Sequence, residues 1–192
     1  MKKVKTWIWV ATFFPWVFAF GLVSTLFGQD QKKTKTMKVL QVNSTVFKQN
    51  SLIPSLYTCD GRNISPPLGW EGAPPETKSF ALICDDPDAP MGTYIHWVMY
   101  NIPTSVSQLS EHFLVKGNPI KEILGGKNSA GKTEYTGPCP PSGTHRYFFK
   151  VYALDVKLDE KEGLSAETLV KVMEGHVLAK GDLMGKYERQ TK

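Results

Sequence analysis

The sequence predicts a mainly β protein of the β-sandwich type, and three observations carry this prediction. From residue 39 onward, short apolar runs are separated by clusters of proline and glycine, of which the chain has 13 and 16. These two residue types mark tight turns, so the runs between them are expected to be strands. Apolar residues make up 41% of the 192-residue chain, which is enough to build a core and excludes wholesale disorder.

Four segments are predicted to be strands, in the order 39–47, 79–85, 94–102 and 145–155. The first alternates between two sets of side chains, as expected for a strand whose two faces meet different surroundings. The other three are nearly continuous apolar or aromatic runs, which indicates strands buried within the domain.

One α-helix is predicted after the last of these strands. Ser165 is a suitable N-cap residue, and Gly181 is predicted to end the helix. Between them, residues recur at the spacing of one helix face: Leu169, Val172, Met173, His176 and Val177. Because His176 lies on this apolar face, it is interpreted as a structural, hydrogen-bonded histidine rather than a ligand-binding one.

The N-terminal 38 residues differ from the rest of the chain in charge and hydropathy. The stretch 7–27 has no charged residue and follows three lysines, which is typical of a secretory signal peptide or a membrane anchor. Residues 1–28 are therefore predicted to be a signal peptide or an N-terminal membrane anchor, residues 29–38 a basic linker, and residues 39–192 the folded domain. This organisation predicts a periplasmic or extracytoplasmic domain, which is secreted, or held at the membrane if the hydrophobic segment is retained.

The positive charge of the chain is confined to its N-terminal part. The chain has a net charge of +5, but residues 1–38 carry +6 and residues 39–192 carry −1. A domain without net positive charge lacks the electrostatic attraction on which nucleic-acid binding depends, so no nucleic-acid partner is predicted.

Residues 126–133 match the phosphate-loop pattern G-x-x-x-x-G-K-[ST] but lack its structural context. Such a loop needs a buried strand before it and a helix after it, so that amides at the helix N-terminus surround the phosphates. Here two charges interrupt the short preceding run, and the prolines that follow prevent a helix. The segment is interpreted as a flexible surface loop, and neither a nucleotide nor any other cofactor is predicted.

Ionisable residues and turn-forming residues concentrate in two segments, 85–97 and 137–147. In the first, a predicted strand ends in carboxylates, prolines fix a turn, and the next strand carries His96. In the second, a stiff turn of prolines and glycines leads into a strand that begins with His145. A carboxylate beside an imidazole fixes the tautomer of the ring, and the free ring N–H can then donate to a small anion.

These motifs resemble those of the phosphatidylethanolamine-binding protein family, also called Raf-kinase-inhibitor-like proteins, and most closely its bacterial branch. The matching motifs follow in order along the domain: Y-T-C-D-G, S-P-P-L-G-W, D-P-D-A-P, H-W, G-P-C-P-P-S-G, H-R-Y and E-G-H-V-L. The resemblance implies a large central antiparallel-rich sheet, a smaller sheet, a few short helices and a small pocket for phosphate-like anions. The ligand-binding residues predicted on this basis are Asp86, Asp88, Pro90, His96, Cys139, His145 and Tyr147.

Three functions remain open at the level of the sequence. The first, which is preferred mainly because the family resemblance implies it, is a non-enzymatic protein that binds a small anion such as phosphate or a phosphoester head group. The absence of a motif of an activated nucleophile supports this choice. The second is a regulator that inhibits a protease or a kinase through the same pocket. The third is an enzyme that uses Asp86, Asp88, His96 and His145 as a metal site or as general acids and bases.

The three cysteines are too few for a disulfide-stapled miniprotein. Cys59 and Cys139 could form a disulfide in an oxidising compartment. Cys84 lies in a predicted buried strand and would then be the unpaired one.

Overall fold

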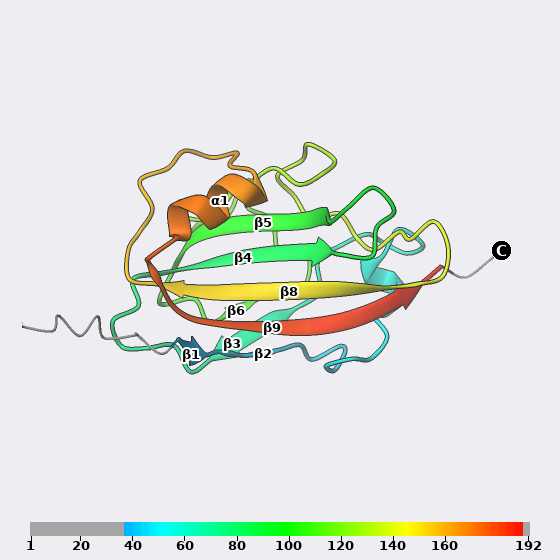
Figure 1. Cartoon of the computed structure of the whole chain (residues 1–192), viewed down its shortest axis with the longest axis horizontal. Coiled ribbons are helices and arrows are strands. Elements are labelled where there is room, and N and C mark those ends of the chain that lie inside the picture. The colour runs from blue at the N-terminus through cyan, green and yellow to red at the C-terminus, as the bar shows by residue number, and fades with distance from the viewer. Residues whose placement is uncertain (1–36, 190–192) are drawn as a thin grey trace, which may run out of the picture. The chain divides into compact units, whose positions relative to one another are not determined.

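The computed structural model of the chain describes residues 37–189 and contains two β-sheets (Figure 1). The large sheet has six strands in the order β1-β9-β8-β4-β5-β7, and the small sheet has three antiparallel strands in the order β2-β3-β6. The large sheet consists of β1 (Lys38–Val39), β4 (Ser79–Asp86), β5 (Tyr94–Pro103), β7 (Leu124–Gly125), β8 (Thr144–Leu154) and β9 (Val177–Glu188). The small sheet consists of β2 (Gln41–Asn43), β3 (Leu68–Glu71) and β6 (Gln108–Leu109). The prediction of a mainly β domain with a large and a small sheet is confirmed.

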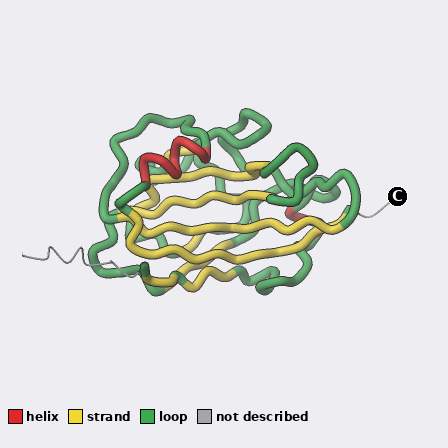
Figure 2. The backbone as a smooth tube through the Cα atoms, viewed as in Figure 1, coloured by secondary structure: helices red, strands yellow, loops and turns green. Residues whose placement is uncertain are grey.

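Helices are short and few within the described residues (Figure 2). They are the 3-10 helix η1 (Ser55–Tyr57) and the α-helix α1 (Ala166–Met173). None of the helices in residues 37–189 is long and apolar enough to cross a membrane. The predicted signal peptide or anchor, residues 1–28, and most of the predicted linker lie outside the described residues.

The large sheet is covered on both faces, which explains why its central strands are so apolar. On one face it packs against the small sheet, where the rings of Trp70 in β3 and Phe80 in β4 meet edge to face with centroids 5.5 Å apart. On the other face, Ala81 and Ile83 of β4 pack against Leu169 of α1. The strand β4 is buried along its whole length between β5 and β8, as its sequence predicts.

The predicted strand 39–47 is divided between the two sheets. Its first part, β1, pairs in parallel with β9, and its second part, β2, pairs with β3. Leu40 lies between them and is buried, with its amide donating to the Lys180 carbonyl at 2.9 Å. One strand-like run therefore connects the two layers of the sandwich.

The predicted helix begins at the right residue but ends too late. The Ser165 hydroxyl accepts a hydrogen bond from the Thr168 amide at 3.1 Å, as an N-cap residue does. The helix ends at Met173 because Gly175, with φ of +81°, turns the chain away, and residues 177–188 form the unpredicted strand β9. Gly181, which was predicted to end the helix, lies inside β9 instead. There its backbone approaches Leu40 so closely that a Cβ would lie 2.1 Å from the Leu40 carbonyl oxygen.

Candidate functional site

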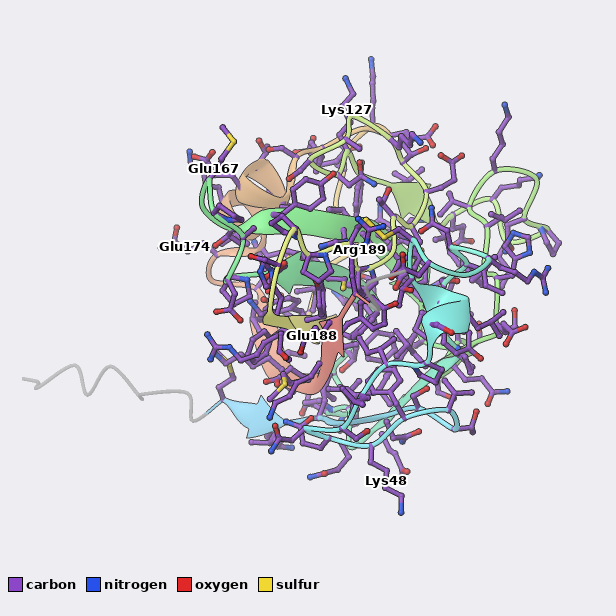
Figure 3. All side chains as sticks on the ribbon, turned by 90° about the vertical axis from the view of Figure 1, so that its right-hand side faces the viewer. Lys48, Lys127, Glu167, Glu174, Glu188 and Arg189 are labelled. Carbon is purple, nitrogen blue, oxygen red and sulfur yellow. A yellow bond between two sulfur atoms is a disulfide. The ribbon has the colours of Figure 1, made fainter. Side chains whose placement is uncertain are left out.

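The two segments rich in ionisable residues meet at one end of the large sheet, where β4 ends and β5 and β8 begin. This end of the strands faces the viewer in Figure 3. A cavity of about 220 Å³ lies there, lined by Asp86, Ala89, Pro90, Tyr94, His96, Thr136, Gly137, Cys139, Pro140, Pro141 and His145. Five of the seven predicted ligand-binding residues therefore belong to the cavity wall: Asp86, Pro90, His96, Cys139 and His145.

Asp86 connects the turn after β4 to the first histidine of β8. Its Oδ1 atom accepts the Asp88 amide at 2.8 Å, which fixes the turn, and its Oδ2 atom lies 2.8 Å from Nδ1 of His145. Both side chains are buried. Because a carboxylate only accepts, the hydrogen of the His145 ring is on Nδ1, and Nε2 is the atom that remains for the cavity.

His96 is held in the same tautomer by a different partner. Its Nδ1 atom lies 2.6 Å from the carbonyl oxygen of Thr136, which can only accept. Burial lowers the pKa of His96, although the Thr136 carbonyl and the Asp86 carboxylate oppose this effect. The ring is therefore neutral near pH 7, with the lone pair of Nε2 left for the cavity. The sequence prediction of a free ring N–H needs this refinement, because that N–H exists only after protonation.

The wall formed by residues 137–141 is tied to the turn that follows η1. Cys139 forms a disulfide with Cys59, with Cα atoms 5.4 Å apart, which confirms the pairing that the sequence left open. The Gly137 amide donates to Asn63 Oδ1 at 2.6 Å, and a Cβ at Gly137 would lie 2.5 Å from the Tyr57 carbonyl oxygen. The wall is thus fixed before any ligand enters. Cys84 is free and buried in β4.

Two predicted residues lie outside the cavity wall. Asp88 forms an ion pair with Arg146, whose Nη2 and Nε atoms donate to its two carboxylate oxygens at 2.7 and 2.9 Å. These hydrogen bonds lower the pKa of Asp88 to about 2. Tyr147 is fully buried beneath the site, with its ring edge to face against His96 at 5.2 Å between centroids. Burial raises the pKa of Tyr147, and the nearby Asp86 carboxylate raises it further.

Some cavity residues were not predicted from the sequence. Tyr94, whose ring centroid lies 4.9 Å from that of His96, could have been found because residues two apart in a strand share a face. Thr136 carried no signal, because its contribution to His96 is a backbone carbonyl.

A larger cleft of about 640 Å³ lies beside α1, on residues of the large sheet and of α1. Its carboxylates pair with lysines of the same cleft, Asp85 with Lys150 and Glu167 with Lys171. We place the candidate site in the smaller cavity because His96 and His145 line it together, and each ring has its hydrogen bond at Nδ1 and leaves Nε2 for a ligand. Within residues 37–189, no group of three or more histidine, cysteine or acidic residues is arranged to hold a metal ion.

Comparison with known proteins gives the same family that the sequence motifs resemble. Residues 43–188 match the model of the family described as phosphatidylethanolamine-binding protein. A UPF0098 protein of Methanothermobacter thermautotrophicus is 50% identical over 150 residues, which cover 78% of this chain and 99% of the relative. A UPF0098 protein of Aquifex aeolicus is 47% identical over 79% of this chain and 90% of its own.

Two crystal structures share the fold. A phosphatidylethanolamine-binding protein homolog from Chlamydia trachomatis has a TM-score of 0.74 at 41% identity, covering 80% of this chain and 99% of its own. E. coli YbcL, described as a new member of the mammalian family, has a TM-score of 0.73 at 31% identity and covers 79% of this chain and 99% of its own.

Proposed function

The chain belongs to the phosphatidylethanolamine-binding protein family, and from this premise we propose that it is a non-enzymatic binding protein for small phosphate-like anions. One observation carries the proposal: His96 and His145 line one cavity, and both give their Nδ1 hydrogen to an acceptor of the protein. Two Nε2 atoms are thereby left to the ligand. Members of the family are generally non-catalytic binding proteins, which agrees with this use of the rings.

Anion binding by these rings requires protons. A neutral imidazole whose hydrogen is on Nδ1 has only a lone pair at Nε2, so it accepts a hydrogen bond and cannot donate one. An anion is bound when Nε2 takes up a proton, or when the ligand brings a P–OH group that donates to the ring. Phosphomonoesters, with a second pKa of about 6, can use both routes. Inorganic phosphate can do so as well, because a large share of it carries a P–OH group near neutral pH. Binding is therefore expected to tighten as the pH falls toward 6.

The size of the cavity favours a head group over a whole lipid or nucleotide. Its volume of about 220 Å³ is below the range of roughly 300–1,000 Å³ that is typical of drug-sized ligands. Pro90, Pro140 and Pro141 give the wall a rigid apolar rim, so little entropy is lost when a ligand is held there.

Calorimetric titration with phosphate and with phosphoethanolamine tests the proposal. Both ligands are expected to bind with net proton uptake, measured as a dependence of the observed heat on the ionisation enthalpy of the buffer. Saturation at a hundred times Kd should stabilise the fold by about 2.7 kcal/mol and raise the melting temperature. If millimolar phosphate, sulfate and phosphoethanolamine all leave the melting temperature unchanged, the proposal is wrong.

Matched variants separate the site from the rest of the protein. His96→Gln and His145→Gln are expected to abolish the heat of binding while the domain stays folded. His176→Gln is the control, because the ring of His176 is paired with Asp155 at 2.9 Å and lies outside the cavity wall. Its binding should equal that of the wild type.

A further inference from the structure

The loop 126–133, which matches the phosphate-loop pattern, closes around one buried side chain instead of around an open space. Asn128 is 6% exposed, and its Oδ1 atom accepts the amides of Ala130 and Lys132, each at 3.0 Å. Gly131 has φ of +73°, which lets the chain turn back toward Lys132. The glycine-containing pattern therefore forms a turn around the Asn128 side chain and not a phosphate-binding loop.

The amide nitrogen of Asn128 points the other way, toward the candidate site. It donates to the Glu134 carbonyl at 2.9 Å and to the Thr136 hydroxyl at 3.0 Å, and it lies 3.3 Å from the His96 carbonyl. The Thr136 amide also donates to the His96 carbonyl, at 3.0 Å. Asn128 therefore holds residues 134–136 against the start of β5.

The residue held in this way is the one that sets the tautomer of His96, because the Thr136 carbonyl accepts the Nδ1 hydrogen. The aromatic rings of Tyr94 and Tyr147 also pack against His96, and these ring contacts do not distinguish the two tautomers. We infer that Asn128 is a positioning residue, which acts through Thr136 to keep the hydrogen of His96 on Nδ1 and Nε2 free for the ligand. This inference deepens the proposed function and rests on it for the ligand.

The loop has a second attachment that does not depend on the Asn128 side chain. Ser129 exchanges hydrogen bonds with Ile95, from the Ile95 amide to the Ser129 hydroxyl and from the Ser129 amide to the Ile95 carbonyl, each at 2.9 Å. A variant at Asn128 is therefore expected to keep the loop on β5 and the domain folded.

Asn128→Asp tests the inference, because it preserves shape and the acceptor for Ala130 and Lys132 but removes both amide hydrogens. The tautomer of His96 is read from the ring nitrogen signals in ¹⁵N NMR spectra. We expect a mixture of tautomers at His96 and an unchanged His145 ring.

Asn101→Asp is the matched control. Asn101 is a second buried asparagine, whose amide donates to the Leu158 carbonyl at 2.9 Å and whose Oδ1 accepts the Leu158 amide at 2.8 Å. Its replacement should lower stability to a similar degree and leave the His96 signals as in the wild type. Equal effects of both variants on His96 would overturn the inference, since they would reflect general loosening.

A smaller change covers the case in which Asn128→Asp does not fold. Thr136→Val removes only the hydroxyl that accepts from Asn128 and is expected to shift the tautomer of His96 in the same direction. A His96 ring that stays entirely in the wild-type tautomer in the folded variants would refute the role of Asn128. Failure of the wild type to bind phosphate would instead refute the proposed function, while the tautomer shift would still decide the role of Asn128.

Discussion

The two histidines of the cavity are held by partners with different charge, and this difference sets what each ring can do. A neutral carbonyl holds the His96 ring, whereas a carboxylate holds the His145 ring and can balance a positive charge on it. Burial keeps His96 neutral at pH values where an exposed histidine gains a proton. A bound anion would supply the negative charge that a protonated His96 ring needs and that its carbonyl partner does not provide. Ligand binding and protonation of His96 should therefore favour each other.

The lowered pKa of His96 predicts a pH-dependent stability. Between the ordinary histidine pKa of about 6.5 in the unfolded chain and the lower pKa in the folded protein, the unfolded state binds more protons at this residue. The folded state therefore loses stability as the pH falls through this range. The groups that act on the ring are Asp85, Asp86 and His145. His96→Gln should make the fall from pH 7 to 5 less steep, by at most about 1.4 kcal/mol per pH unit. Urea unfolding at several pH values measures this, and identical slopes for both proteins would contradict it.

At the scale of the elements, the strands that carry the site could be predicted because each layer of the sandwich buries one of their faces. The segments that form β4, β5 and β8 are long and rich in apolar residues. This pattern is typical of central strands in a sheet that is covered on both faces. The strand β9 was missed because Gly181 was interpreted as the end of a helix. In the structure, Gly181 and Gly185 instead permit close packing of Leu40 and Ile53. Such packing depends on residues more than a hundred positions away, which a local pattern does not contain.

The position of several residues of the candidate site could be predicted for a related reason. Three cavity residues lie at or near strand ends that adjoin stiff turns: Asp86, His96 and His145. The sequence shows both the turns and these ionisable residues, so their meeting at one end of the sheet could be predicted. The sequence could not show that Asp88 would pair with Arg146, since that contact depends on the register of β4 and β8. The sequence also could not show that Thr136 holds the His96 ring, because the contact is made by a backbone carbonyl, which every residue has.

The close approach at Gly181 leads to a prediction for β9. Gly181→Ala should lower the free energy of unfolding by about 1–3 kcal/mol, because the new Cβ would collide with the Leu40 carbonyl and disturb the pairing of β1 with β9. Gly69→Ala in β3 is the control, since its Cβ would meet only the movable Asn43 side chain, at 3.0 Å. Chemical denaturation compares the two, and a smaller loss for Gly181→Ala than for Gly69→Ala would disprove the role of the contact.

At the scale of the whole molecule, one covalent bond joins parts of the chain that are 80 residues apart. The bond between Cys59 and Cys139 fixes the cavity wall to the turn after η1, and Cys139 is exposed at the surface. In the chain-entropy model, closing a loop of this size stabilises a protein by about 4.5 kcal/mol. Such bonds persist in oxidising compartments and are rare in the cytosol, so the covalent support of the cavity wall depends on the export that the sequence predicts, which we propose here for this domain.

This dependence predicts the thiol content of the protein in the cells that make it. If residues 1–28 direct export, the denatured protein should react with one maleimide per molecule without reductant, at Cys84, and with three after reduction, whether or not residues 1–28 are removed. Cys84→Ala should lower these values to none and two, which assigns the free thiol. Mass spectrometry of cells quenched in acid gives the numbers. Three reactive thiols without reductant would place the chain in a reducing compartment, and the proposal of export would then fail together with the covalent support of the cavity wall.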